Sequence, residues 1–148
     1  MTDHTAAYGA FLLRASLGVL ALAHGLLKVF VFTVPGTVQF FQSLGYPGAV
    51  AYLVIFGEVA GGLALIAGVW TRAVALLMLP ILIGAALTHL GNGWLFSAPK
   101  GGWEFPVFWT AALLAQALLG SGAFALRIPG AARVLQVIGL QPAFGART

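Results

Sequence analysis

Residues 49–70 read AVAYLVIFGEVAGGLALIAGVW, an apolar run with a single charged side chain, Glu58, near its middle. A helix needs about 20 predominantly apolar residues to cross the hydrocarbon core of a bilayer, and this run has that length. Three further apolar stretches of similar length lie at residues 11–32, 73–91 and 105–126. We therefore expect an all-α protein, a bundle of four transmembrane helices joined by short loops.

The composition supports a membrane protein. The chain has 148 residues, of which 61% are hydrophobic and 7% charged, whereas an ordinary globular domain carries about 25% charged residues. The absence of cysteine excludes iron–sulfur clusters held by thiolates and covalently attached c-type haem. The net charge of +4 includes no basic block, so we expect the lipid bilayer, and no nucleic acid, as a partner.

The distribution of polar residues predicts three segments and an orientation. Residues 1–10 form a polar N-terminal tail, residues 11–126 the membrane domain, and residues 127–148 a basic C-terminal tail. The arginines are expected at helix ends, and in a four-span topology five arginines fall on one side and two lysines on the other. These are Arg14, Arg72, Arg127, Arg133 and Arg147, against Lys28 and Lys100. The positive-inside rule then places both termini in the cytoplasm. We expect the protein in the cell (inner) membrane.

The connections between the apolar stretches predict how the helices are joined. Residues 37–44 are expected to form a short interfacial helix between the first two spans. The link at Thr71 and Arg72 is so short that the second and third spans must be antiparallel neighbours. The longest loop covers residues 91–103.

Small residues predict which helix faces lie inside the bundle. Membrane helices approach closely where small side chains line the contact, and the second span carries Gly57-x-x-x-Gly61. Glu58 follows the first of these glycines. His24 and Lys28 lie four residues apart on one face of the first span, beside Gly25. The polar side chains therefore point into the bundle rather than toward lipid.

Counting about 1.5 Å of rise per residue brings five ionisable residues from four helices into the outer half of the bundle. They are His24, Lys28, Glu58, His89 and Glu104. A charge within the membrane is costly, so Lys28 is the natural partner of Glu58. The cluster could hold a proton, an anion or a polar headgroup such as a quinone ring. Alternatively, it serves only to fix the packing of the first two helices.

A metal site is the weaker interpretation of the same residues. His24 and His89 with a carboxylate from Glu58 or Glu104 would suit a divalent ion chemically, but no H-x-x-x-H spacing supports such a site. His24 and His89 lie at different depths, which disfavours haem between them. We therefore predict no metal and no covalently bound cofactor.

The same positions resemble the motifs of the DoxX family of small membrane proteins, over about residues 11–126. The resemblance rests on four fragments in order: His24-Gly25-Leu26-Leu27-Lys28; Phe40-Phe41-x-x-Leu44-Gly45-x-Pro47; Glu58-x-x-Gly61-Gly62; and His89-x-x-Asn92-Gly93 with Gly101-Gly102-Trp103-Glu104-Phe105-Pro106. Trp103 departs from the family pattern, where tyrosine is commoner. The resemblance implies a four-helix bundle that acts as a subunit of quinone-linked oxidoreductase systems.

Residue by residue, the resemblance points to the ionisable cluster together with Asn92 as the ligand or proton site. Three hypotheses about function follow. The first is a quinone-linked oxidoreductase subunit, which requires a partner redox subunit because the chain has no evident redox centre of its own. The second is a non-catalytic accessory or assembly subunit, alone or as a homo-oligomer. The third is a small-solute transporter, which the small size and the one-sided cluster disfavour.

Overall fold

The computed structural model describes residues 2–126, and the predicted C-terminal tail at residues 127–148 lies outside them. The described residues are helical and contain no strand, which confirms the all-α prediction for this part of the chain. The elements in order are α1 (Thr2–Phe30), α2 (Val34–Ser43), α3 (Ala49–Ala67), α4 (Thr71–His89), the 3-10 turn η1 (Leu90–Asn92) and α5 (Glu104–Leu119).

Three of these helices are long and apolar enough to cross a membrane: α1, α3 and the segment of α4 with η1. The fourth predicted span, α5, is apolar but has only 16 residues. It ends at Leu119 rather than near residue 126 because Gly120 turns the backbone to a φ of 84°. Beyond Gly120 the chain folds back over the same end of the bundle, where Ala123 N–H donates to the carbonyl of Ala7 at 2.9 Å.

The first helix is longer than its sequence predicts. It begins at Thr2, so the residues assigned to a polar tail continue the helix. Alanine has the highest helix propensity, and Ala6, Ala7 and Ala10 lie in this first part of α1. The Tyr8 ring also packs on Phe124, with the ring centroids 5.8 Å apart. Propensity and tertiary contact together extend the helix.

The other boundaries shift by a few residues. The short helix predicted at residues 37–44 is α2 (Val34–Ser43), with a proline in its first turn. The link between α3 and α4 is Gly68 to Trp70 rather than Thr71 and Arg72, because Gly68 adopts the left-handed conformation that ends α3, with a φ of 77°. Thr71 is already the first residue of α4. As predicted, α3 and α4 are consecutive helices in contact.

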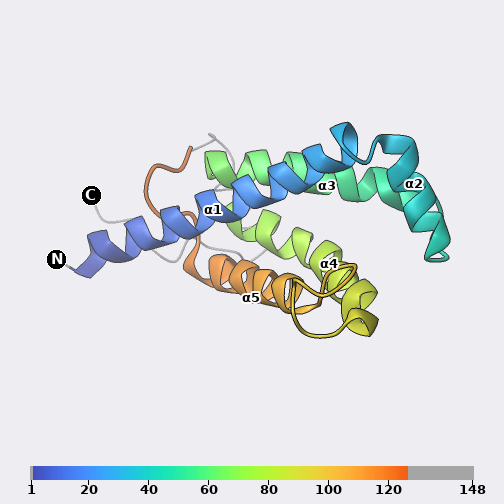
Figure 1. The fold of residues 1–148 in the computed structure, drawn as a ribbon. Coiled ribbons are helices and arrows are strands. Elements are labelled where there is room, and N and C mark those ends of the chain that lie inside the picture. Colours follow the sequence, from blue (N-terminus) through green and yellow to red (C-terminus); the bar gives the residue numbers. More distant parts are fainter. Residues whose placement is uncertain (1, 127–148) are drawn as a thin grey trace.

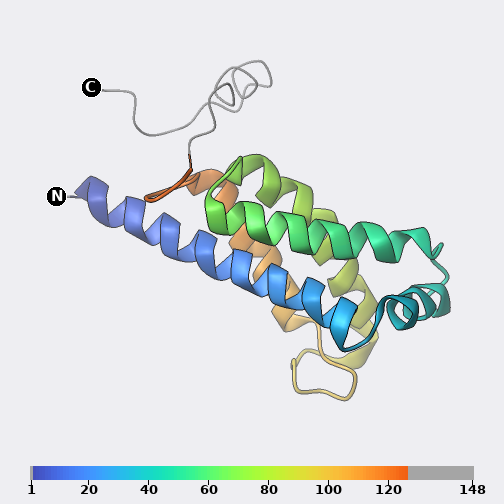
Figure 2. The same cartoon turned by 90° about the horizontal axis from the view of Figure 1, so that it is seen from above.

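The four long helices form two closely packed pairs, α1 with α3 and α4 with α5 (Figure 1). The two pairs contact each other less extensively than the helices within each pair. Figure 2 shows α2 across one end of the α1–α3 pair, and the loop after α4 projects at the same end. We call this the α2 end of the bundle, and the opposite end the strap end, after the returning segment 120–126.

Glycines bring α1 and α3 together. A Cβ atom at Gly62 would lie 2.6 Å from the backbone nitrogen of Leu22, and one at Gly18 would lie 2.8 Å from the carbonyl of Gly62. No real side chain fits at such distances, so the backbones touch there. The predicted stripe of Gly57 and Gly61 instead faces α4, where added Cβ atoms would meet Ile81 and Met78. Small residues therefore line interior faces, as predicted.

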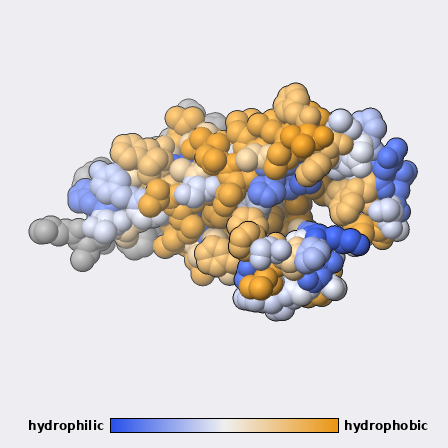
Figure 3. Space-filling model, in the orientation of Figure 1, coloured by the Kyte–Doolittle hydropathy of each residue, from blue (hydrophilic) through white to orange (hydrophobic). Residues whose placement is uncertain are grey.

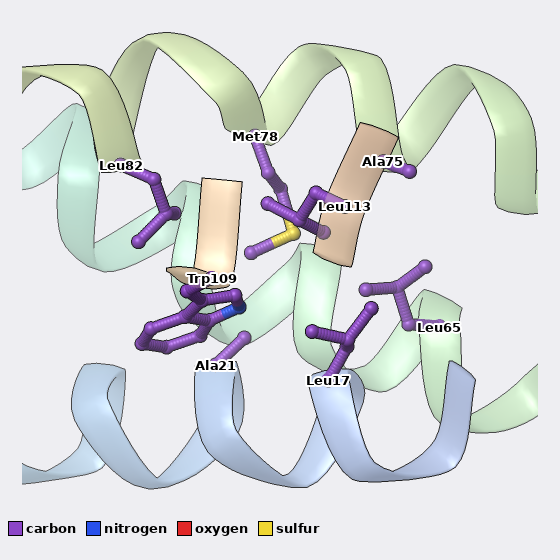
Figure 4. Packing of buried hydrophobic residues seen from close by; sticks show 8 residues of the cluster. All are labelled: Leu17, Ala21, Leu65, Ala75, Met78, Leu82, Trp109 and Leu113. Carbon is purple, nitrogen blue, oxygen red and sulfur yellow. The ribbon is translucent and has the colours of Figure 1, made fainter. Parts of the chain in front are cut away.

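The hydrophobic core lies between the two pairs, and all four long helices contribute to it. Figure 4 shows its buried side chains: Leu17, Ala21, Leu65, Ala75, Met78, Leu82, Trp109 and Leu113. Each of them is at most 4% exposed. This core separates the α2 end of the bundle from the strap end. The polar residues at the two ends therefore form separate groups.

Candidate functional site

Lys28 and Glu58 form an ion pair between α1 and α3, as the sequence predicts. The Lys28 Nζ atom lies 2.8 Å from each of the two carboxylate oxygens of Glu58. The side chains of Lys28 and Glu58 are 19% and 7% exposed, respectively. Gly25 allows this contact, since a Cβ at Gly25 would lie 2.7 Å from a methyl carbon of Val59 and 3.2 Å from the Cβ of Glu58. The two helices are therefore in close contact within one turn of the pair.

His24 lies on the same face of α1, one turn before Lys28, and contacts α5. Its Nδ1 atom is 2.8 Å from the backbone carbonyl of Leu20. Because a carbonyl oxygen can only accept, Nδ1 donates in this contact, which leaves Nε2 outside this hydrogen bond. The ring meets Trp109 edge-on at 5.0 Å and stacks on Phe105 at 6.2 Å. These aromatic contacts fix the orientation of the imidazole.

The three polar residues line one cavity between the two helix pairs, with a volume of about 580 Å³. Its wall is otherwise mostly apolar, and comprises His24, Lys28, Glu58, Ile81, Leu82, Ala85, His89, Phe96, Gly101, Gly102, Phe105, Pro106 and Trp109. Figure 3 shows a hollow between the α1–α3 pair and the loop that joins α4 to α5, with hydrophilic side chains at its edge. Apolar walls with a few polar groups, in this size range, are typical of small-molecule sites.

The remaining candidate residues are arranged differently. His89 lines the cavity from the end of α4. Its Nδ1 atom lies 3.2 Å from the carbonyl of Gly101 and also 3.2 Å from the amide nitrogen of Asn92. Asn92 donates to the Gly101 carbonyl at 2.9 Å. The Asn92 side chain therefore holds His89 and the loop in place and does not line the cavity.

Glu104 lies outside the cavity wall. One of its carboxylate oxygens accepts a hydrogen bond of 2.8 Å from the backbone N–H of Phe96, and its own N–H donates to the carbonyl of Trp94 at 3.1 Å. The structure thus brings His24, Lys28, Glu58 and His89 together, while Glu104 holds the shape of the loop. Within residues 2–126, no group of three or more His, Asp or Glu side chains is arranged to hold a metal ion.

Arg14 differs most from its predicted place at a helix end. It lies well inside α1 and is completely buried. Its guanidinium donates to the carbonyls of Leu65 and Ile66 at 2.8 and 2.9 Å, and to the carbonyl of Ala123 at 3.0 Å. The carbonyls at the end of a helix lack partners within that helix, and Arg14 supplies them for α3 while anchoring the returning segment.

A second buried polar layer was not predicted. Thr71 and Gln116 are, like Arg14, at most 1% exposed, and each of the three carries one side-chain atom without a hydrogen-bond partner. Arg14, Thr71 and Gln116 lie one turn from the core residues Leu17, Ala75 and Leu113 on their helices, toward the strap end. The sequence contains one indication of this layer: Arg14 lies on the same helical face as Leu17 and Ala21.

The family model of DoxX matches residues 9–91, which cover α1 to α4 apart from the first residues of α1. The match therefore ends before the motif at residues 101–106. No solved structure matches the chain.

A curated protein of Bacillus subtilis (strain 168), named "Putative oxidoreductase CatD", is 40% identical over 80 residues. The aligned region covers 54% of this chain and 58% of the relative, so the chain spans little more than half the length of that protein. The family match extends over more than half of the chain and includes His24, Lys28, Glu58 and His89. The chain therefore belongs to the DoxX family.

Proposed function

We propose that this protein is the quinone-binding subunit of a membrane-bound oxidoreductase, with the quinone headgroup in the 580 Å³ cavity. The observation that carries the proposal is the ion pair of Lys28 and Glu58 beside His24, on the wall of a cavity that is otherwise mostly apolar. The name of the Bacillus subtilis relative supports oxidoreductase chemistry for that protein. Family membership extends the argument to this chain.

The donor and acceptor set fits a quinone. A quinone carbonyl needs a hydrogen-bond donor, and the Lys28 ammonium has three. A quinol hydroxyl needs an acceptor, which Nε2 of His24 and the carboxylate of Glu58 both supply. Phe105 and Trp109, which hold the His24 ring, give the cavity aromatic walls against which a flat ring packs well.

The chemical roles follow from this set. Oxidation of a quinol releases two protons and two electrons. His24 and Glu58 are the groups placed to accept the protons, since both are bases within the cavity wall. The chain contains no cysteine, and we assign the electrons to a redox centre on a partner subunit. The protein would then bind and deprotonate the quinol while the partner carries the electrons away.

The proposal includes four membrane spans. We infer that α5 is the fourth, although its 16 residues reach only about 24 Å at 1.5 Å per residue. A bilayer can accommodate a short helix by local thinning. With Arg14 buried, the orientation argument rests on Arg72 and the arginines beyond residue 126, which favour both termini in the cytoplasm and the α2 end on the outer side of the cell membrane.

Binding of a quinone analogue to the purified protein in nanodiscs, followed by quenching of tryptophan fluorescence, tests the proposal. Glu58→Gln and His24→Ala should each weaken binding at least tenfold, because the first removes the anionic base that pairs with Lys28 and the second removes the imidazole acceptor. Glu104→Gln is the matched control: it makes the same chemical change outside the cavity wall and keeps an acceptor for the Phe96 N–H. Equal affinity in all four proteins would contradict the proposal.

A second candidate function is an accessory or assembly subunit. The observation in its favour is that Lys28 and Glu58 satisfy each other directly, with two contacts of 2.8 Å. A pair of this kind can serve packing alone. This candidate predicts that Lys28→Met combined with Glu58→Leu preserves both folding and cellular function. Loss of function in a well-folded double variant would exclude it.

A further inference from the structure

A second cavity of about 830 Å³ lies against the first. The two cavities share part of their walls, formed by Lys28, Glu58, Ile81, Ala85 and His89. The ion pair therefore stands where the cavities meet. A ligand with its polar head beside Lys28 and Glu58 has two directions in which the rest of the molecule can extend, and the second cavity is one of them.

The wall of the second cavity is strongly apolar away from the shared residues. It is lined by Phe32 in the turn after α1, Phe40 and Phe41 on α2, Val54 on α3 and Pro80 on α4, among others. The Thr37 and Thr88 hydroxyls in this wall already donate to backbone carbonyls. The wall therefore offers a polar molecule few hydrogen bonds, whereas hydrocarbon packs against it at little cost. The chemistry of this cavity therefore suits an aliphatic chain.

The second cavity opens through side chains that also lie on the protein surface. Phe32, Phe40 and Tyr46 all line it, and they are 61%, 51% and 46% exposed. Large apolar side chains at a rim are stable against lipid and unfavourable against water. The opening therefore suits entry from the bilayer.

The position of α2 beside this opening is fixed rather than loose. The buried Thr37 hydroxyl is 3.1 Å from the carbonyl of Lys28 and 2.9 Å from that of Thr33. It links α2 to the backbone of the same residue that forms the ion pair. The wall that α2 contributes is thus held in register with the polar end of the site.

We propose that the second cavity binds the isoprenoid tail of the quinone, so that the ligand is a lipid-resident prenylquinone and not a water-soluble quinone. This inference rests on the proposed function. The ring lies in the smaller cavity beside His24, the chain passes the Lys28–Glu58 pair, and the tail leaves between α2 and α4. The tail then contributes to affinity through burial of apolar surface.

Gly84 provides the means to test this. It lines the second cavity and is absent from the wall of the first. A Cβ atom added there meets no other atom within 4 Å, so Gly84→Phe should place its ring in the tail cavity without disturbing the helices. Ile83→Phe is the matched control, because Ile83 is 47% exposed and lines neither cavity.

The experiment measures the affinity of a long-chain prenylquinone and of its tail-less analogue in nanodiscs, with concentrations expressed per lipid. The wild type should bind the prenylquinone at least tenfold more tightly. Gly84→Phe should remove most of that difference while leaving the affinity for the tail-less analogue unchanged, and Ile83→Phe should resemble the wild type. Equal affinity of the wild type for both ligands, or a Gly84→Phe variant that retains the difference, would overturn the inference. If the wild type binds neither ligand, the proposed function itself fails.

Discussion

The Lys28–Glu58 ion pair allows a quantitative prediction about the stability of the bundle. At a separation of 2.8 Å and an effective dielectric constant of about 20, the Coulomb attraction is about 6 kcal/mol. Removal of the two charges from water offsets much of this gain. The net contribution of the pair is therefore small, whereas the penalty for leaving either charge alone in the membrane is large.

The perturbation is a double-mutant cycle with Lys28→Met and Glu58→Leu. Each single variant leaves one buried charge without its partner and should lower the free energy of unfolding by about 3–5 kcal/mol. The double variant leaves no charge behind and should be as stable as the wild type or up to about 4 kcal/mol more stable, because replacement of a buried pair by apolar residues is often neutral or stabilising. The coupling energy should therefore be several kcal/mol.

The free energy of unfolding is measured in mixed micelles by tryptophan fluorescence. A second cycle, Lys28→Met with Glu104→Leu, is the control, because Glu104 bonds to the Phe96 N–H and not to Lys28. Its two effects should add within about 0.5 kcal/mol. The reasoning is refuted if the Lys28 and Glu58 effects are also additive, or if each single variant loses less than about 1 kcal/mol.

Three further predictions concern packing and buried polar groups. Gly62→Ala should destabilise the bundle by about 1–3 kcal/mol, because α1 must move away. Gly9→Ala is the control: its added methyl meets nothing within 4 Å, so it should stabilise the bundle by about 0.5–1 kcal/mol. Thermal unfolding of both variants shows whether each change raises or lowers the stability. Arg14→Met should cost more than about 3 kcal/mol, since three hydrogen bonds from a charged group are lost, and denaturant titration would contradict this with a shift below about 1 kcal/mol. Glu104→Gln should change stability by less than about 1 kcal/mol because the amide oxygen still accepts from the Phe96 N–H, and a larger loss would show that the charge itself holds the loop.

The long helices and the central ion pair could be predicted from the sequence because both depend on local patterns. Apolar length indicates a membrane helix, and small residues beside Glu58, His24 and Lys28 indicate which faces turn inward. The position of α2 was predicted to within a few residues. The site residues nearest the ion pair were found for the same reason, since a charge inside an apolar helix requires a partner.

Other features depend on contacts between distant segments, which the sequence does not display. Arg14 resembles an end-of-helix arginine in the sequence, and its carbonyl partners lie 51, 52 and 109 residues further along the chain. The end of α5 depends on the backbone of Gly120, although the apolar pattern continues past it. The role of Glu104 depends on how the loop returns to the Phe96 N–H. The cavities likewise arise from the separation of the two helix pairs.

A photoreactive quinone that carries its reactive group on the ring tests most directly whether the cavity beside Lys28 and Glu58 holds the headgroup. After irradiation of the protein in nanodiscs, mass spectrometry identifies the labelled residues. The account predicts labels on α1 near His24 and on α5 near Phe105, and predicts that an excess of unlabelled quinone suppresses them. Labels confined to outward-facing residues such as Leu118, which is 80% exposed, and unaffected by competitor would contradict it.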